Sequence, residues 1–210
     1  MNLLDRIEWL GQATVKITTE NTKIYIDPYM IKDKDPADFI FITHSHYDHL
    51  SMEDIRKVSN NQTRIFAAYD CIPKLSDAGF TRIRGVAPGD REDLEHFKFE
   101  AVPAYNVKKT NYHPKSNRWL GYIFELEGKR IYHSGDTERI PEMKNFHCDI
   151  ALLPLGKTYT MNSVEEAVEA AKDTGAKTAI PIHYGLYEGK EEDAMKFREL
   201  LKNEVEVVIK

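Results

Sequence analysis

Three histidines and an aspartate occur within six residues, directly after a short apolar run. In DFIFITHSHYDHLS, residues 38–51, these residues are His44, His46, Asp48 and His49. Neutral imidazole and carboxylate are ligands that suit zinc, iron and manganese. Four such groups are costly to remove from water without a cation, so a metal centre is expected rather than a polar loop of hydrogen-bonded histidines.

The spacing within this segment indicates two coordination spheres. Residues two apart in an extended chain point the same way, so His44 and His46 can reach one ion together. Asp48 and His49 lie in the turn that follows and can face a second ion. One segment cannot fill both spheres, so further ligands must come from elsewhere in the chain.

Two later apolar strands end in further candidate ligands. RIYHSGDT offers Asp136 and TAIPIHYG offers His183, each with a glycine nearby. Either residue alone would be an ordinary polar group of a loop, but beside the histidine-rich segment both are expected to bind metal. Two ions that share a hydroxide could attack a carbonyl or phosphoryl group, with Asp48 and Asp136 orienting or deprotonating it.

The elements that must position these residues alternate between strands and helices. Strands are expected over 6–11, 14–19, 23–28, 38–43, 64–69, 81–86, 95–102, 119–126, 129–134, 149–155, 178–182 and 204–209. Helices are expected near 51–59, 70–78 and 188–201 and within NSVEEAVEAAKDTGAK, residues 162–177, because cap residues and apolar stripes mark them. Ser51 is the expected cap of the first helix, and Asn162 or Ser163 that of the helix within 162–177, which ends at Gly175. Pro181 suggests a sheet edge or a strand end. Strands with outer helices predict a layered α/β domain.

Length, charge and cysteine content limit the class of protein. The 210 residues suit one domain or two tightly joined halves, and the net charge of −5 gives no support for nucleic-acid binding. No window is apolar enough to span a membrane and no secretory signal is recognised, so a cytoplasmic protein is expected. Cys71 and Cys148 are expected to be buried free thiols.

Several motifs carry a resemblance to a known superfamily. THSHYDH resembles the H-x-H-x-D-H signature of the metallo-β-lactamase superfamily, and YHSGDT and PIHYG are similar to its later ligand motifs. WLGQATVKI, IDPY and LLPLGKTYTM resemble more narrowly a branch of small metal-dependent hydrolases that includes relatives of L-ascorbate-6-phosphate lactonase. The resemblance implies an α/β (α+β) fold, a four-layer αβ/βα sandwich. It also implies one domain, 1–210, with pseudo-halves of roughly 1–110 and 111–210.

The resemblance implies a role for each candidate residue. It assigns the first ion to His44 and His46, the second to Asp48, His49 and His183, and a bridge between them to Asp136. Asp27 matches a position that supports the histidine loop, although an Asp-Pro turn would explain it equally. Where many relatives have a histidine this chain has Asn106. His113 is therefore expected as the third ligand of the first ion, with Asn106 as the alternative.

The expected function is hydrolysis by a metal-bound hydroxide. The bond would be an ester, lactone or amide bond of a small molecule, which could carry a phosphate. The alternatives are a metal-dependent phosphodiesterase and a non-catalytic metal-binding or ligand-sensing protein. Lys157 and Tyr159 could meet a phosphate or an oxyanion, or be a solvated lysine and a packed tyrosine. His133 could support a ligand, carry a proton or simply be buried.

The expected cofactors are two divalent metal ions. Zinc is the first expectation, and manganese, iron and nickel are alternatives because they accept the same nitrogen and oxygen ligands. The expected partner is a small-molecule substrate, with no nucleic acid and no membrane. The branch often forms homo-oligomers, so a homo-oligomer is an open alternative to a monomer.

Overall fold

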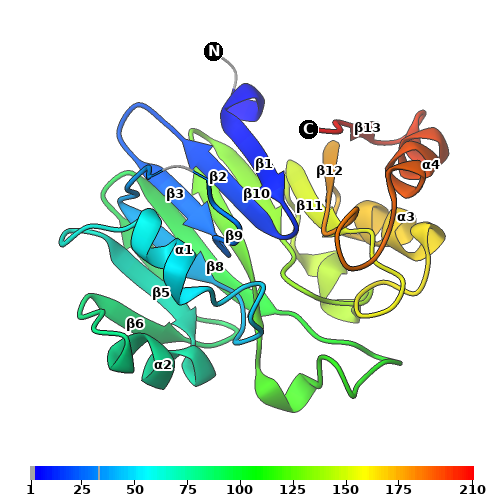
Figure 1. Ribbon diagram of the computed structural model, residues 1–210. Helices are drawn as coiled ribbons and strands as arrows, with labels where there is room; N and C mark the ends of the chain where they lie inside the picture. Colours follow the sequence, from blue (N-terminus) through cyan, green and yellow to red (C-terminus); the bar gives the residue numbers. More distant parts are fainter. Residues whose placement is uncertain (1–2, 33) are drawn as a thin grey trace. The chain divides into compact units, whose positions relative to one another are not determined.

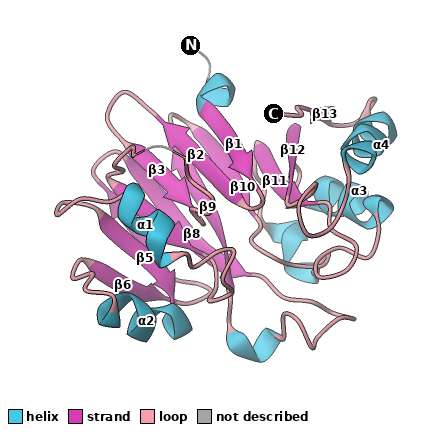
Figure 2. Cartoon of the chain, viewed as in Figure 1, coloured by secondary structure: helices cyan, strands magenta, loops and turns pink. Residues whose placement is uncertain are grey.

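The computed structural model describes residues 3–32 and 34–210. The chain divides into two compact units, Met1–Ala87 and Pro88–Lys210, and each is built on one β-sheet (Figures 1 and 2). Together the described residues form two sheets and four α-helices, which confirms the expected mixed α/β class. The expectation of a single domain whose halves divide near residue 110 stays a prediction.

The sheet of the first unit has the strand order β1-β2-β3-β4-β5-β6. Its strands are β1 (Ile7–Gly11), β2 (Thr14–Thr18), β3 (Lys23–Ile26), β4 (Phe39–Ile42), β5 (Arg64–Ala68) and β6 (Ile83–Val86). The first three strands pair antiparallel, whereas β3 to β6 pair in parallel. Parallel strands place their carboxyl ends at one edge, so the segments that follow β3, β4 and β5 gather there.

Two short helices connect the parallel strands of this unit (Figure 1). They are α1 (Met52–Lys57) and α2 (Ile72–Asp77), with single 3-10 turns at Leu3–Arg6 and Tyr69–Cys71. The Ser51 hydroxyl accepts a hydrogen bond from the Asp54 N–H and begins α1, as its sequence predicts. Phe41 and Phe66, from neighbouring strands, stack with ring centroids 5.1 Å apart. Such buried aromatic pairs stabilise the core of the sheet.

The sheet of the second unit has the strand order β13-β12-β11-β10-β9-β8-β7. Its strands are β7 (Arg91–Leu94), β8 (Phe97–Pro103), β9 (Leu120–Leu126), β10 (Lys129–His133), β11 (Ile150–Pro154), β12 (Thr178–Ile182) and β13 (Glu206–Val207). β7 to β10 pair antiparallel, whereas β10 to β13 pair in parallel. The segments after β10, β11 and β12 therefore meet at one sheet edge.

Helices α3 (Val164–Asp173) and α4 (Glu191–Leu201) belong to this unit (Figure 2). Two 3-10 segments, Lys115–Asn117 and Pro141–Asn145, lie in its loops. The Ser163 hydroxyl accepts from the Glu166 N–H, which selects Ser163 over Asn162 as the cap of α3. The expected apolar stripe of α3 is buried, because its period of three to four residues places it on one helix face.

Two features of this sheet differ from a simple interpretation of the sequence. The charged segment REDL forms the edge strand β7, whereas only one strand, over 95–102, was expected in this region. The residues of β7 have little strand propensity, and pairing with β8 makes the segment a strand. β12 is not an edge strand, since it pairs with both β11 and β13. Pro181 lies past the last residue that pairs with β13, Ala179, so its missing N–H disturbs no ladder on that side.

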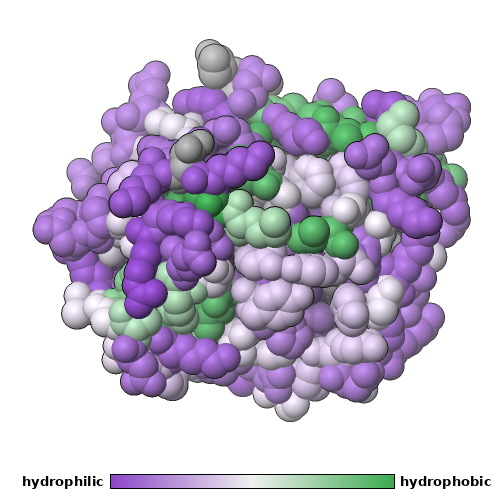
Figure 3. All heavy atoms as spheres, viewed as in Figure 1, coloured by the Kyte–Doolittle hydropathy of each residue, from purple (hydrophilic) through white to green (hydrophobic). Residues whose placement is uncertain are grey.

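Surface and burial agree with the composition. Hydrophilic residues, in purple, cover most of the face that Figure 3 shows. Within the described ranges, no helix is long and apolar enough to cross a membrane. Cys71 and Cys148 are free and buried, as expected, because small apolar side chains pack readily in a core.

Candidate metal centre

The histidine-rich segment follows a central parallel strand of the first sheet. β4 pairs with β3 on one side and β5 on the other, and Ile40, Phe41 and Ile42 are buried. The chain leaves the sheet at Thr43 and runs through the candidate ligands until α1 begins after Ser51. The expected order of buried strand, histidine-rich loop and helix is therefore confirmed.

The three imidazole rings of this segment are in contact. Nε2 of His44 lies 3.0 Å from Nδ1 of His46, and the ring centroids of His44 and His49 are 3.9 Å apart. His44 and His49 are buried, and His46 is half-buried. Zinc–nitrogen bonds measure about 2.0–2.1 Å, so one ion could be bound by both close nitrogens. The two-residue spacing brings His44 and His46 together as the sequence predicts.

Asp27 binds both ends of the histidine segment. Its carboxylate accepts hydrogen bonds from the N–H and the hydroxyl of Thr43, at 2.8 and 2.6 Å. Nδ1 of His49 lies 2.8 Å from the same carboxylate, so its Nε2 is the nitrogen that faces Asp48, 3.6 Å away. Asp27 adopts φ +46°, a conformation that costs about 1 kcal/mol and is concentrated at functional sites. These contacts are those of a residue that orients a histidine, and an Asp-Pro turn alone would not produce them.

Gln12 is a residue of this site that sequence reasoning missed. It lies in the turn between β1 and β2 with φ +48°, and it is buried. Its Nε2 donates a hydrogen bond of 2.9 Å to Oδ2 of Asp48. Its local signals were the GQ pair in a strand-breaking position and its place in WLGQATVKI, and a turn explains the pair as well as a site does.

The second unit places Asp136 between two histidines. Oδ2 of Asp136 lies 3.3 Å from Nε2 of His113, and Oδ1 lies 3.2 Å from Nε2 of His183. Asp136 follows β10, His183 follows β12, and His113 comes from the loop between β8 and β9. All three side chains are buried, and His183 adopts φ +56°. The fold of this unit thus brings together three candidates that are far apart in the sequence.

Asn106 contacts the same loop but in a different way. Its Nδ2 donates to the carbonyls of Tyr159 and Lys109, at 2.6 and 3.2 Å, and its N–H donates to the carbonyl of His113. Nδ1 of His113 lies 3.1 Å from the Tyr159 carbonyl, while its Nε2 faces Asp136. Nδ2 of Asn106 also lies 3.3 Å from Nδ1 of His113, but it directs its two hydrogens to the Tyr159 and Lys109 carbonyls. Of the two alternatives for a third ligand, only His113 has a ring nitrogen beside another candidate ligand, Asp136.

Glu188 is a second residue that sequence reasoning missed. Its carboxylate is buried and lies 3.1 Å from Nδ1 of His183. Burial acts to raise the pKa of Glu188, but the contact with His183 and the hydrogen bond from the Tyr159 N–H outweigh it, so the pKa lies below the ordinary value. In the sequence it is one of many glutamates near the last helix, so no local signal marked it.

The remaining candidates have local partners. Lys157 forms an ion pair with Asp193, with 2.6 Å between Nζ and Oδ1. Tyr159 is partly exposed, and its ring packs edge-on against Tyr112 at 5.0 Å between centroids. His133 is fully buried, and its Nδ1 accepts a hydrogen bond from the Gly135 N–H at 3.2 Å. These contacts anchor Lys157 and His133 in the fold, whereas Tyr159 stays partly exposed.

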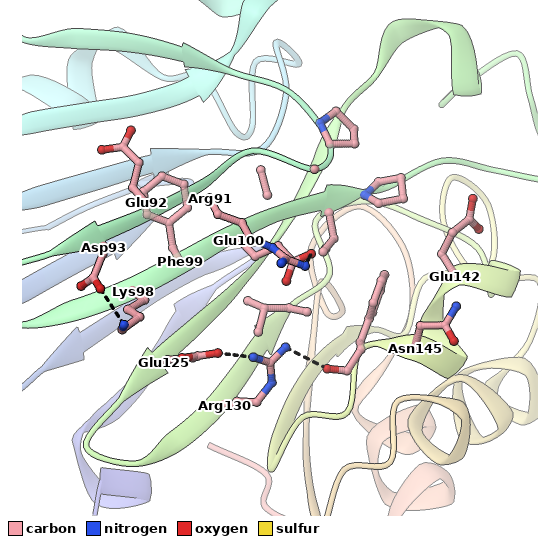
Figure 4. Close-up of a pocket in the computed structure, with 17 residues that line it drawn as sticks. Arg91, Glu92, Asp93, Lys98, Phe99, Glu100, Glu125, Arg130, Glu142 and Asn145 are labelled. Atoms are coloured by element: carbon pink, nitrogen blue, oxygen red, sulfur yellow. Dashed lines mark hydrogen bonds and ion pairs between the residues drawn. The ribbon is translucent and has the colours of Figure 1, made fainter.

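A separate hollow of about 890 Å³ lies in the second unit over β7 to β10 (Figure 4). Its charged side chains pair with one another, as in Arg91 with Glu100 and Lys98 with Asp93. None of the candidate ligands lines it. Surface ion pairs of this kind contribute little and recruit no ligand by themselves, so this hollow is not part of the candidate centre.

The donor set fits divalent metal ions. Every candidate ligand offers an imidazole nitrogen or a carboxylate oxygen, and all except His46 are buried. Burying so many titratable groups in contact is unfavourable by several kcal/mol per charge unless opposite charge compensates it. Divalent metal ions provide that charge and accept these ligands, so the residues fit such a cofactor.

The comparison with known proteins agrees with the fold and the donor set. A family model described as beta-lactamase superfamily domain matches residues 17–184, a range that contains all the candidate ligands. The chain belongs to this superfamily. The expected metallo-β-lactamase fold is thereby confirmed.

More similar relatives share a narrower family name. A UPF0173 protein of Pyrococcus abyssi is 34% identical over 98% of this chain and 95% of its own length. A UPF0173 metal-dependent hydrolase of Saccharolobus solfataricus is 32% identical over 94% of this chain and 92% of its own. A crystal structure from Parabacteroides distasonis, assigned as a metal-dependent hydrolase, is 35% identical with a TM-score of 0.86, and the match covers 97% of this chain and 91% of that one. Homologues of this chain are therefore named metal-dependent hydrolases, and those names specify neither metal nor substrate.

Proposed function

We propose that the chain hydrolyses an ester, lactone or amide bond of a small molecule, with water activated by two divalent metal ions. Divalent ions in such centres lower the pKa of a bound water and polarise the attacked group. The observation that carries the proposal is Asp136, whose two oxygens lie beside two different histidines. A carboxylate in this position suits a bridge between two ions.

We propose further that the centre is dinuclear. Two catalytic ions need about six protein ligands, and the candidate ligands of this chain reach that number. The proposed ligands are His44, His46 and His113 for the first ion, Asp48, His49 and His183 for the second, and Asp136 for both. We expect zinc, with manganese, iron and nickel as alternatives that accept the same groups.

The residues of this chain would orient the reaction. Asp48, held by Gln12, and Asp136 would orient the attacking water, and one of the two would accept its proton. Tyr112 and Tyr159 would offer a partly exposed aromatic surface to the substrate. Lys157 is paired with Asp193, so recognition of a phosphate by Lys157 is not part of the proposal.

Elemental analysis of the purified protein tests the centre. The wild type is expected to hold about two equivalents of metal, and Asp136→Asn well below that number, because the variant loses the bridging carboxylate. Asp149→Asn is a matched control in the same unit, since Asp149 binds the Arg130 N–H rather than a histidine. Full metal content in the Asp136 variant would contradict the dinuclear proposal.

A substrate screen then tests the reaction. Turnover of p-nitrophenyl acetate or of simple lactones, abolished by a chelator and restored by zinc, is the expected result. Turnover of bis(p-nitrophenyl) phosphate alone would favour the phosphodiesterase. Metal binding without turnover of any of these compounds would favour a non-catalytic metal-binding protein.

A further inference from the structure

A buried glutamate of the second unit contacts both a candidate ligand and the loop that follows β11. Oε1 of Glu188 lies 3.1 Å from Nδ1 of His183 and accepts from the Thr160 hydroxyl at 2.9 Å. Oε2 accepts from the N–H groups of Thr158 and Tyr159, at 2.7 and 2.6 Å. Each oxygen therefore has two partners, and a carboxylate is the one side-chain group that can accept on both sides.

The peptide groups of Tyr159 extend this contact to a second histidine. Its N–H is bound by Glu188, and its carbonyl lies 3.1 Å from Nδ1 of His113. Glu188 therefore contacts His183 directly and reaches His113 through a single residue. This is the same loop that places the exposed ring of Tyr159 against Tyr112.

Both contacts are made at Nδ1 of a histidine ring. A hydrogen on Nδ1, donated to a carboxylate or a carbonyl, leaves Nε2 as the unprotonated nitrogen. Nε2 is the nitrogen that lies near Asp136 in both rings, at 3.3 Å for His113 and 3.2 Å for His183. A metal ligand must present an unprotonated nitrogen, so these contacts select the tautomer that can bind.

The Glu188 carboxylate occupies the space beside Gly156 that a side chain at that position would fill. A Cβ atom at Gly156 would come within 1.7 Å of Oε1 of Glu188. The chain turns back directly after the glutamate at Gly189, where φ is +64° and a Cβ would lie 2.8 Å from the Leu155 carbonyl oxygen. Any larger residue at Gly156 would displace the carboxylate from its present place.

We propose that Glu188 is the positioning residue that presents His113 and His183 to the metal ions. It sets the tautomer of His183 by direct contact and that of His113 through the Tyr159 peptide. The inference rests on the proposed function, because it takes both histidines as ligands. The inference goes beyond the proposed ligands, because it gives Glu188 a role: its carboxylate connects His183 and His113 to the loop between β11 and α3.

Glu188→Gln tests whether the contact with His183 and the contacts with the loop are both needed. An amide can accept hydrogen bonds at its oxygen only, so glutamine can satisfy His183 or the loop N–H groups of Thr158 and Tyr159, but not both. If the NH₂ group faces His183, the ring must move its hydrogen to Nε2. If it faces the loop, the N–H of Tyr159 loses its acceptor, and the Tyr159 carbonyl beside His113 is held only by the Asn106 amide. The first result removes a competent ligand, and the second loosens the partner that orients one.

Glu138→Gln is the matched control. Glu138 is also buried in the second unit, and its carboxylate also accepts from the N–H groups of a loop, those of Val107, Lys108 and Lys109 at 2.7, 2.6 and 3.1 Å. Its carboxylate contacts backbone rather than a histidine ring. Both variants should lose a similar amount of thermal stability, since both break an anchored loop.

The test combines zinc affinity with the tautomers of the metal-free proteins. Competition with a chromophoric chelator should show zinc binding weakened by about 10-fold or more in Glu188→Gln and in Gly156→Ala, and little changed in Glu138→Gln. Long-range ¹H–¹⁵N spectra of the metal-free proteins should show hydrogen at Nδ1 of both rings in the wild type. At least one ring should change in the Glu188 variant.

Two results would overturn the inference. One is an equal loss of zinc affinity in the Glu188 and Glu138 variants, which would mean that Glu188 only holds its loop in place and does not orient the histidines. The other is a Glu188 variant in which His113 and His183 both keep the wild-type tautomer. If the wild type binds neither zinc nor manganese, iron or nickel, the proposed function fails, and the spectra of the metal-free proteins still decide whether Glu188 sets the tautomers.

Discussion

The carboxylate of Asp27 lies 2.8 Å from Nδ1 of His49, and both side chains are fully buried. The same carboxylate binds the N–H and the hydroxyl of Thr43 at the other end of the loop. Since Asp27 follows β3 and the loop follows β4, two neighbouring parallel strands are joined at their carboxyl ends. Asp27 therefore orients a candidate ligand and also closes the loop that carries it.

Asp27→Asn is expected to affect both stability and metal affinity. An amide oxygen can replace only part of the contacts to Thr43 and His49, so about 1–3 kcal/mol of the free energy of unfolding should be lost. Zinc affinity should fall about 10- to 100-fold, as for other residues that orient metal-binding histidines. Urea unfolding and chelator competition measure the two effects.

Asp70→Asn serves as the control for this substitution. Asp70 follows β5 at the same edge, is exposed, and accepts a hydrogen bond from the Ser45 hydroxyl. Its variant should change stability and zinc affinity little. Equal effects of both variants would mean that Asp27 has no special role.

His113→Ala and Asn106→Ala separate the two candidates for a third ligand. His113→Ala should lose about one of the two metal equivalents, because a first ion left with two histidines is bound weakly. Asn106→Ala should keep both, since the Asn106 amide binds the Tyr159 and Lys109 carbonyls. Elemental analysis decides between them, and the reverse result would make Asn106 the ligand.

Stability should depend on pH through Asp54. Burial acts to raise the pKa of Asp54, but hydrogen bonds from Ser51, Lys57 and the N–H groups of Met30 and Ile31 outweigh it and hold the pKa below 3.8. Because the folded pKa is the lower one, this contribution is complete above 3.8 and is lost as the pH falls through the folded pKa. Asp54→Asn should cost about 1–2 kcal/mol near neutral pH, and progressively less as the pH falls below 3.8.

Glu53→Gln provides the comparison for that measurement. Glu53 is exposed and pairs with Lys57 on the surface of α1. Such pairs contribute less than about 1 kcal/mol, so the difference from wild type should be small throughout the pH series. A constant difference between wild type and Asp54→Asn down to acid pH would contradict the role given to Asp54.

The two cysteines should resist thiol reagents while the protein is folded. Burial raises the pKa of Cys148 from 9.0 to about 11, and burial also raises that of Cys71. Two pKa units leave about 100-fold less thiolate, which is the reactive form. Native protein should react with Ellman's reagent at least that much more slowly than protein unfolded in guanidinium chloride. Rapid native labelling would show that the thiols are accessible.

Much of the candidate site could be predicted from the sequence because its signals are local. His44 and His46 are in contact as their spacing indicates, and Asp136 and His183 follow strands as expected. The cap and the apolar stripe of α3 follow from residue type and helical period. β7 was missed because its residues have little strand propensity and pairing alone makes them a strand.

The sequence by itself determined the donor groups of the candidate ligands, their order after the strands, and the superfamily, because residue type and short-range spacing are local properties of a chain. Only the tertiary structure decided the partners that orient those ligands. Gln12 reaches Asp48 across 36 positions, and Asp27 reaches His49 across 22. Glu188 was one acidic residue among 34 until folding brought it against His183. Hydrogen bonds select partners by distance and direction in space, and a linear pattern does not carry that information.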